Sequence, residues 1–362
     1  MSPSPSPSPI SLILLISLLF TYFISATSAS FKCTANHTCQ SLIGYVPPNS
    51  TTVSSIKRLF GLKTHHQLLG SNSWPLSEPN RTVQAGSVVR VPVPCKCTNG
   101  TGVSNRTPFY KVRKGQTLDG IATNVFVGFV TYQEIVAVNG IKNPNLIQIG
   151  QEIWIPLPCS CDDVEGARAV HYGHVVVAGS SVAQIAGEFG TTRETLMSLN
   201  GIADPKQLKA GTILDVPLKA CKSSVDNTSL DSSLLVPNGT YALTANNCVE
   251  CSCNSDDLQL RCKTAQKVRI SNWKQCPPMQ CSGNLTLGAN MTATCSLTTC
   301  AYTGYTKERI LTVLSNQSTC PTGGAPGLQP LDISAAGIER EWRWRGLFVS
   351  LITGLLCFSF PW

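Results

Sequence analysis

Residues 110–158 decide the fold, and they read YKVRKGQTLDGIATNVFVGFVTYQEIVAVNGIKNPNLIQIGQEIWIPLP. Gly115 is a turn glycine between a first strand and an apolar periodic segment. Five apolar residues of that segment share the i, i+3, i+4, i+7, i+8 spacing of one helical face: Leu118, Ile121, Ala122, Val125 and Phe126. This periodicity predicts an amphipathic helix directly after the turn.

The second half of the stretch predicts another helix and a closing strand. Thr131 is followed three residues later by Glu134, the spacing of a capping box at a helix start. Ile153 and Ile155 alternate with Trp154, and Pro156 ends the strand. The stretch therefore predicts the order strand, helix, helix, strand, a small α+β unit with a two-stranded sheet.

The same plan returns in residues 174–218, which read HVVVAGSSVAQIAGEFGTTRETLMSLNGIADPKQLKAGTILDVPL. Three residues of the first stretch recur 61 positions later: Asn139, Gly150 and Pro156 match Asn200, Gly211 and Pro217. Thr191 and Glu194 predict a second capping box. Self-similarity of this kind is the mark of a repeated structural unit.

A weaker copy precedes these two. Leu68 and Asn72 are spaced like Ile135 and Asn139, and Gly86 and Pro92 are spaced like Gly150 and Pro156. The chain is therefore expected to hold three βααβ modules: module one (31–94), module two (109–158) and module three (172–218).

The two ends of the chain predict secretion and a lipid anchor. Residues 1–30 carry no charge and place an apolar run before small residues, which predicts a signal peptide. Residues 347–362 are apolar, and a polar spacer and the small residues 334–336 precede them, as in a GPI signal. We expect 321–334 to be a linker ending at the attachment site Ser334, with the small residues 323–325 as the alternative site, and 335–362 to be removed. An uncleaved membrane helix at either end is the alternative, but both runs are short of the usual ~20 residues.

Cysteine usage and sequons agree with an extracellular location. Cys357 lies in the apolar end, and without it an even number of the 17 cysteines remains, as expected for disulfides in an oxidising compartment. Zinc is the competing interpretation of the Cys-x-Cys pairs and of Cys248, Cys251 and Cys253, and secretion favours disulfides. Asn-X-Ser/Thr sequons predict glycans at Asn36, Asn49, Asn80, Asn99, Asn105, Asn227, Asn238, Asn284, Asn290 and Asn316. The net charge of +8 is not gathered into a Lys/Arg block, so no nucleic-acid partner is expected.

The repeated pattern carries a family resemblance. Gly-x-Thr/Ser, Ile-Ala, Asn-Gly-Ile-x-x-Pro and Gly-x-x-Ile/Leu-x-x-Pro resemble the LysM module. Three copies separated by Cys-x-Cys pairs resemble the extracellular part of plant LysM receptors, and most of all the GPI-anchored chitin elicitor-binding type. The resemblance runs from Phe31 through Cys320 and includes the segments 154–161 and 244–253.

This resemblance implies the cysteine pairing of the modules. It pairs Cys33 with Cys97, Cys39 with Cys161, and Cys95 with Cys159, which would tie the three modules into one disulfide-stapled block. Residues 221–320 show no repeat and hold further cysteines, so we expect a loop-rich, cysteine-rich domain whose pairing the sequence leaves open.

The resemblance also implies where ligand binds. In LysM folds a sugar lies in a shallow groove between the first strand–helix loop and the loop from the second helix to the second strand. In module two these loops supply the candidate chitin-binding residues Gly115, Gln116, Thr117, Leu118, Asp119, Gly120, Ile121, Lys142, Asn143, Pro144, Asn145, Leu146, Ile147, Gln148 and Ile149. The counterparts in module three are 179–182 and 202–208.

Several of these residues have a structural interpretation as well. Asn139 and Asn200 are expected to fix the helix-to-loop geometry, Ile121 to face the core, and Trp154 to pack rather than stack on sugar. Sequons separate the modules further. Asn49 and Asn80 fall in the two loops of module one, where glycans would obstruct a groove, whereas the loops of modules two and three carry none. We therefore expect module two to hold the principal site.

The expected function is that of a cell-surface receptor on the outer face of the plasma membrane. It would bind chitin oligomers and pass a defence signal through a LysM receptor kinase with a transmembrane helix, and a ligand-bridged homodimer is a further expectation. Peptidoglycan binding and a passive wall-binding role are the alternatives. An enzyme is not expected, because glycan hydrolysis needs two opposed carboxylates and the adjacent Asp256 and Asp257 do not form such a pair. No cofactor or metal is expected.

The anchor generates the first prediction. Phosphatidylinositol-specific phospholipase C should release the protein from plant membranes into the soluble fraction, as measured by immunoblot of pellet and supernatant. A known GPI-anchored protein in the same membranes reports enzyme activity. Retention in the pellet while that control is released would contradict the anchor.

Overall fold

The structure, a computed structural model, describes residues 31–319 except for 36, 223–227 and 255–256. The expected signal peptide, Cys320, the linker with Ser334 and the segment 335–362 therefore lie outside the described residues, as do Asn36, Asn227 and Asp256. Across the described ranges, no helix has the length and apolar character needed to span a membrane.

Module two has the strand–helix–helix–strand order that its sequence predicts. Its elements are β7 (Phe109–Lys111), α4 (Leu118–Gly120), the π-helix η1 (Ile121–Val125), α5 (Tyr132–Asn139), the 3-10 helix η2 (Pro144–Leu146) and β8 (Glu152–Trp154). The predicted apolar face is confirmed, since Leu118, Ile121 and Phe126 are at most 2% exposed. The capping box is confirmed as well: Glu134 N donates to Thr131 Oγ1 (3.3 Å), and Thr131 N donates to Glu134 Oε2 (2.7 Å).

The first helix of module two departs from a regular α-helix. Phe126 N donates to Ile121 O over 3.1 Å, an i→i+5 bond of a π-turn. The sequence explains the irregularity, because Ala122 and Thr131 are nine positions apart whereas Ala186 and Thr192 of module three are six apart. The extra residues of module two include Phe129, which is 1% exposed. The π-turn thus accommodates an insertion that adds a buried ring.

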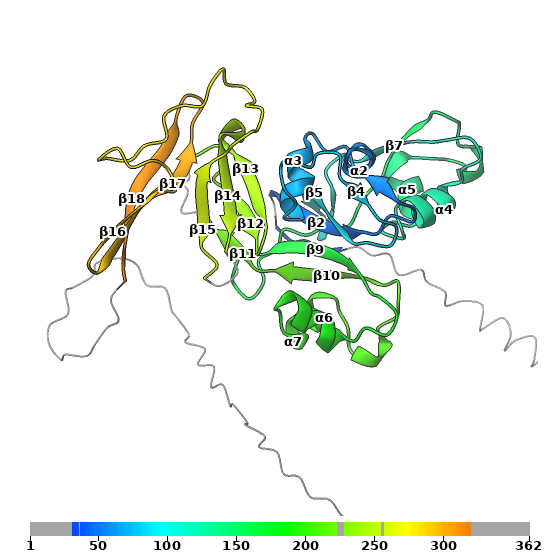
Figure 1. Cartoon of the computed structure of the whole chain (residues 1–362). Coiled ribbons are helices and arrows are strands. Elements are labelled where there is room, and N and C mark those ends of the chain that lie inside the picture. The colour runs from blue at the N-terminus through cyan, green and yellow to red at the C-terminus, as the bar shows by residue number, and fades with distance from the viewer. Residues whose placement is uncertain (1–30, 36, 223–227, 255–256, 320–362) are drawn as a thin grey trace, which may run out of the picture. The chain divides into compact units, whose positions relative to one another are not determined.

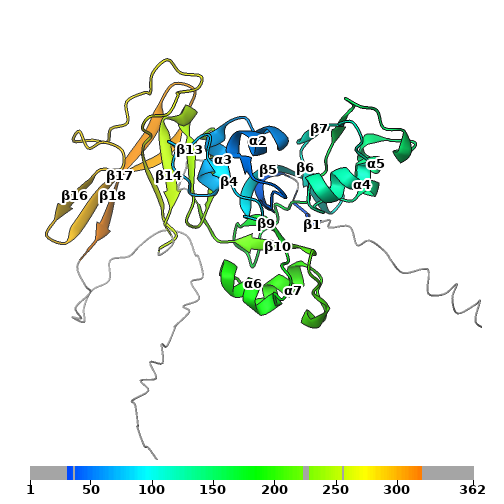
Figure 2. The ribbon, with the colours of Figure 1, turned by 45° about the vertical axis from the view of Figure 1, so that its right-hand side comes forward.

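Module three consists of β9 (Val170–Val175), α6 (Val182–Phe189), α7 (Arg193–Leu199), the 3-10 helix η3 (Pro205–Gln207) and β10 (Ile213–Leu218). In both Figure 1 and Figure 2, α6 and α7 lie against the antiparallel β9–β10 pair. The predicted capping box of Thr191 and Glu194 is wrong. Thr192 is the N-cap and accepts from Thr195 N (3.0 Å). The shift of 61 that relates the modules places Thr195, not an acid, where module two has Glu134.

Module one contains β2 (Thr38–Tyr45), β3 (Thr51–Thr52), α2 (Val53–Leu59), α3 (His65–Ser71), β4 (Thr82–Val83) and β5 (Val89–Thr98), flanked by β1 (Phe31–Lys32) and β6 (Thr101–Ser104). Its sheet is not the separate two-stranded sheet that the sequence predicts. Modules one and three share one six-stranded sheet in the order β1-β6-β5-β2-β9-β10, and only module two keeps its own β7–β8 pair.

The shared sheet depends on a parallel contact between β2 and β9, where Leu42 pairs with Tyr172 and Ile43 with Gly173. This contact covers the edge of β2 that a lone module would leave unpaired. A Cβ atom at Gly44 would lie 2.1 Å from the Tyr172 hydroxyl. Glycine is therefore required at this position for the two modules to approach.

A buried pair of side chains inside module three also contacts the segment before the module. His171 Nδ1 lies 2.8 Å from Asp215 Oδ1, and His171 Nε2 lies 2.7 Å from Asp162 O. Burial alone lowers the pKa of His171, but the Asp215 carboxylate and its hydrogen bond outweigh that effect, so the pKa is raised. Asp162 in turn accepts from Thr34 N (2.6 Å) and Ala35 N (2.8 Å), which holds the N-terminal arm.

One asparagine in each module, the Asn clamp, joins the end of the second helix to the closing strand. Asn139 Nδ2 donates to Ile135 O (2.8 Å) and Trp154 O (2.8 Å), while Trp154 N donates to Asn139 Oδ1 (2.9 Å). Asn72 and Asn200 make the same three bonds in modules one and three. The clamp therefore fixes both ends of the loop between the second helix and the second strand.

The cysteines of the module block form disulfides between Cys33 and Cys97, Cys39 and Cys161, and Cys95 and Cys159. These are the pairings that the family resemblance implies. The Sγ atoms of Cys33, Cys95, Cys97 and Cys161 lie within 4.8 Å of one another. Because each is oxidised, this cluster offers no thiolate to a metal ion.

The remaining described residues form a strand-rich domain with few helical residues. Its elements are β11 (Ala220–Lys222), β12 (Leu235–Pro237), β13 (Tyr241–Thr244), η4 (Ala245–Asn247), β14 (Val249–Cys253), β15 (Leu260–Thr264), β16 (Asn290–Ala293), β17 (Ser296–Tyr305) and β18 (Ile310–Ser318). Its disulfides join Cys221 to Cys253, Cys248 to Cys276, Cys251 to Cys262 and Cys281 to Cys300, and Cys295 is oxidised too. Tyr241 Oη donates to Trp74 O (2.5 Å) and so joins this domain to module one.

The Asn clamp generates the second prediction. Asn139→Ala removes one acceptor and two donors of a half-buried amide and should cost about 2–4 kcal/mol of local stability. Hydrogen exchange of the backbone amides between residues 140 and 151 should report this loss.

Two further variants test the cause. Asn139→Asp should not restore protection, because a carboxylate oxygen would face the carbonyls of Ile135 and Trp154. Asn124→Ala, at an exposed asparagine of the same module, should leave exchange unchanged. Equal protection in Asn139→Ala and in the native protein would contradict the clamp.

Candidate functional site

The two loops that the sequence singles out in module two lie side by side. Gly150 N donates to Val112 O (2.8 Å), and Val112 N donates to Gln151 O (2.9 Å). These bonds join the bases of the two loops. Beyond them lie residues 115–121 and 142–149, between which the family resemblance places the sugar groove, and we call these two loops the first and second wall.

The first wall is held by its own side chains. Gln116 Oε1 accepts from Arg113 N (2.9 Å), and the Gln116 amide also contacts the Tyr110 hydroxyl (2.9 Å to Nε2). Thr117 caps the following helix by accepting from Gly120 N (3.1 Å). The side chain of Gln116, a polar candidate for sugar contact, therefore closes the turn that shapes this wall.

The second wall combines a polar cap with exposed aliphatic groups. Asn143 Oδ1 accepts from Asn145 N (3.0 Å) and starts the short helix η2. Leu146 is 71% exposed and Ile149 is 69% exposed. Lys142 and Gln148 are exposed beside them. This wall offers aliphatic surface and amide groups to solvent together.

Not every candidate residue can offer its side chain. Leu118 is 2% exposed and Ile121 is fully buried, so these two face the core and leave only backbone groups to the groove. Pro144 and Ile147 are half-buried. Trp154 is packed against the module, with its indole Nε1 buried and without a partner among the described residues.

Module one differs at the same place, because its two loops pair with each other. Thr51 pairs with Val83 and Thr52 with Thr82 in the two-stranded β3–β4 sheet. Ser50 Oγ also donates to Gln84 Oε1 over 3.3 Å. In module one, the backbone groups of the two loops are therefore bonded to each other at the place where a groove would lie.

The loops of the other two modules remain apart within the described residues. All three modules share the bond at the loop base, from Gly86 N to Pro47 O (3.0 Å) and from Gly211 N to Val176 O (2.8 Å) in modules one and three. Yet no strand pair among the described residues joins 115–117 to 146–148 or 179–181 to 207–209. Sequence reasoning missed the seal of module one, although its β-branched residues at 51–53 and 82–83 are a signal for short strands.

The described sequon asparagines all lie on the surface. They are Asn49, Asn80, Asn99, Asn105, Asn238, Asn284, Asn290 and Asn316, and each is exposed. Asn49 precedes β3 and Asn80 precedes β4, so both flank the sealed loops of module one.

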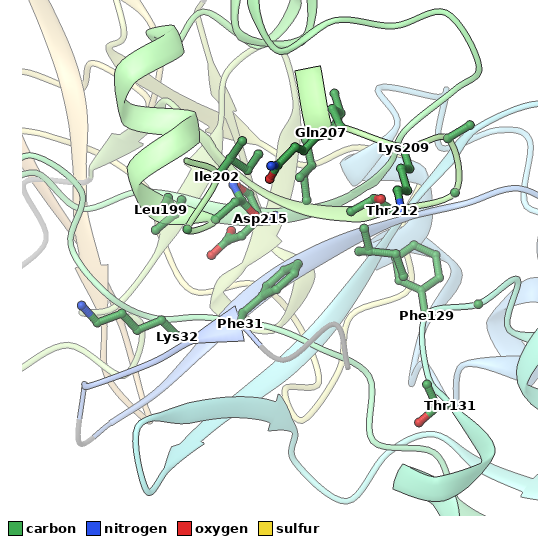
Figure 3. Close-up of a pocket in the computed structure, with 18 of the residues that line it drawn as sticks. Phe31, Lys32, Phe129, Thr131, Leu199, Ile202, Gln207, Lys209, Thr212 and Asp215 are labelled. Carbon is green, nitrogen blue, oxygen red and sulfur yellow. Dashed lines mark hydrogen bonds between the residues drawn. The ribbon is translucent and has the colours of Figure 1, made fainter. Parts of the chain in front are cut away.

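A cavity of about 830 Å³ lies apart from the module-two groove. Figure 3 shows the rings of Phe31 and Phe129 on one side of it and Ile202, Gln207 and Lys209 of module three on another. No candidate residue of the module-two loops lines this cavity. It includes the second loop of module three and the inserted segment of module two.

Comparison with known proteins identifies the architecture. The LysM domain model matches residues 110–156 and 174–217, which are modules two and three. A LysM domain-containing GPI-anchored protein 2 of Arabidopsis thaliana is 46% identical over 86% of this chain and 89% of its own length. The chain belongs to the family of LysM domain-containing GPI-anchored proteins.

Other relatives agree with this assignment. A chitin elicitor-binding protein of Oryza sativa subsp. japonica is 43% identical over 83% of this chain and 85% of its own length. Among solved structures, the ectodomain of a receptor-like kinase aligns with 51% of this chain and 94% of its own, at 21% identity and a TM-score of 0.42. That last likeness is too distant to support a conclusion about function.

Proposed function

We propose that this LysM protein is a receptor for chitin oligomers at the outer face of the plasma membrane and that module two holds its principal binding groove. The name of the Oryza sativa relative supports chitin as ligand, and the name of the Arabidopsis relative supports a GPI anchor. In this proposal the bound oligomer promotes assembly with a LysM receptor kinase that crosses the membrane and starts a defence response.

One observation carries the choice of module. The loops of module one bond to each other through β3 and β4, whereas no strand pair among the described residues joins the two loops of module two. An acetamido group has one N–H donor and one C=O acceptor. It can therefore pair with both walls in the way that the two strands of module one pair with each other.

The side chains of module two match the rest of an N-acetylglucosamine unit. Leu146 and Ile149 are exposed on the second wall, where they can contact the acetyl methyl group and the C–H faces of the ring. The corresponding residues of module three are Gln207 and Ala210, which offer less aliphatic surface. A neutral amphipathic sugar therefore fits module two better.

A shallow groove gives modest affinity for each sugar unit, so longer oligomers should gain by bridging two protein copies. This is the basis for proposing a ligand-bridged homodimer. A lipid anchor places the receptor outside the cell, and the signal then needs a second protein to reach the cytoplasm.

A binding function rather than catalysis is proposed for the cysteine-rich domain as well. A glycosidase needs a carboxylic acid with a raised pKa. The pKa of Asp257 is instead lowered, first by the hydrogen bond from Gln259 N and also by Arg261. Asp257 is therefore suited to holding its loop rather than to donating a proton.

The third prediction tests the groove by bulk. Leu146→Asn with Gln148→Thr creates a sequon at two exposed positions and should place a glycan on the second wall of module two. Titration of chitin oligomers by calorimetry should then show loss of binding by at least about tenfold, a change of roughly 1.4 kcal/mol.

Two matched variants control this experiment. Leu146→Gln with Gln148→Thr changes the same positions without a sequon and should retain more affinity than the glycosylated variant. Gln207→Asn with Lys209→Thr places a glycan at the equivalent site of module three and should leave chitin affinity nearly unchanged. Loss of binding in the module-three variant alone would move the principal site there.

The fourth prediction tests the aliphatic wall. Leu146→Ala with Ile149→Ala removes apolar surface that a sugar would cover and should weaken chitin binding roughly thirtyfold, since each aliphatic side chain contributes on the order of 1 kcal/mol when partly buried. Val88→Ala with Val177→Ala alters two exposed valines outside the groove walls and should have little effect. Equal affinities in both double variants would remove Leu146 and Ile149 from the site.

A further inference from the structure

A second polar depression lies between module one and the cysteine-rich domain. It is a cleft of about 570 Å³ between the α2–α3 region and residues 269–272, a volume within the ~300–1,000 Å³ of small-molecule sites. Its cationic and imidazole groups are Lys57, Lys63, His65, His66 and Arg269. We name it the basic cleft.

The basic cleft has no anionic counterpart in the described part of the chain. No carboxylate lines it, and none of Lys57, Lys63 and Arg269 forms an ion pair with a described acid. Lys63 and Arg269 are exposed at its rim. Like charges gathered in a concave surface concentrate a positive potential and attract anions.

A second observation also points to a missing partner. His66 Nδ1 is buried and makes no hydrogen bond with any described residue. Unpaired buried nitrogen atoms are costly. His65, its neighbour, already contacts Ser54 Oγ through Nε2 (3.1 Å). His66 lines the cleft, so one of its lining side chains carries a buried nitrogen without a hydrogen bond.

The remaining lining indicates the class of anion. Thr64, Asn247, Ser271 and Asn272 contribute hydroxyl and amide groups, and Ile270 is the single aliphatic residue in the lining. A phosphate would need one focused cluster of donors, whereas here the charges come from α2, α3 and the 269–272 segment. Charges spread between hydroxyl and amide groups suit a ligand that repeats carboxylates among sugar hydroxyls.

We propose that the basic cleft binds an acidic polysaccharide, a polymer of uronic acids such as those of the plant cell wall. Lys57, Lys63 and Arg269 pair with successive carboxylates, and the amide and hydroxyl side chains bond the sugar hydroxyls. This site is separate from the module-two groove, so the receptor would hold a charged wall polymer and a neutral chitin oligomer at different places.

The two histidines make this binding depend on pH. Burial lowers the pKa of His65 and of His66, and the neighbouring charge, Lys57 for His65 and His65 for His66, lowers it further. Both imidazoles are therefore neutral near neutral pH. A carboxylate facing them favours the protonated form, so binding takes up protons and should strengthen as the pH falls from about 7 to about 5. The other charged groups that line the cleft are Lys57, Lys63 and Arg269.

The test uses the full-length glycoprotein and a purified oligogalacturonate. Native protein should bind it saturably, and less tightly as salt rises. Lys63→Glu with Arg269→Glu should weaken binding at least about tenfold, the size expected for two lost charge-assisted contacts. Lys96→Glu with Arg193→Glu makes the same charge change at exposed positions elsewhere and should change affinity less than about twofold.

Further arms separate the alternatives. Chitin titration should be unchanged in both charge variants, which reports folding and keeps failure of this site distinct from failure of the module-two groove. The methyl-esterified oligomer should not bind. His66→Gln should reduce the gain in affinity between about pH 7 and pH 5, whereas Lys63→Gln should lower affinity and keep that gain. Equal weakening by the control charge variant, or equal binding of polyglutamate or of the methyl ester, would overturn the proposal.

Discussion

The asparagine at the end of each second helix sets the geometry on which the candidate groove depends. In module two its amide joins the helix to the closing strand. Nδ2 donates two hydrogen bonds, which uses both of its N–H groups, and Oδ1 accepts a third. Both ends of the intervening loop are therefore fixed while its middle is free to vary. A half-buried amide with three specific backbone bonds is costly to replace, and Asn72, Asn139 and Asn200 have the same role in modules whose loops differ.

The loop between the second helix and the second strand has a different surface in each module, although the Asn clamp fixes its ends in all three. In module one the loop is longer and pairs with the opposite loop as a short strand. In module two it carries exposed Leu146 and Ile149, and in module three it carries Lys209, which lines a cavity. Backbone groups must be bonded to each other, to a ligand or to water. Loops that pair with each other in module one and do not pair in module two therefore allow repeated modules to differ in ligand binding.

Module position follows from strand pairing and disulfides together. Three disulfides join the N-terminal arm, module one and the segments on either side of module two, and β9 adds module three to the sheet through β2. Small units of this size are marginal alone. Module two keeps its own sheet and is joined through covalent bonds and a shared apolar core, which leaves both of its groove loops accessible.

The sequence alone determined the repeat, the helix and strand order, the capping of α5 by Thr131 and the structural role of Asn139, since these depend on local spacing. It misplaced the N-cap of α7, because Thr191 and Glu194 have the spacing of a capping box although the helix starts after Thr192. Only packing decides which of the two threonines caps the helix. The π-turn after Ile121, the shared β2–β9 sheet and the β3–β4 seal were decided by tertiary structure. Each depends on which edge or loop comes to lie beside another, and spacing within one module carries no information about a partner elsewhere in the chain.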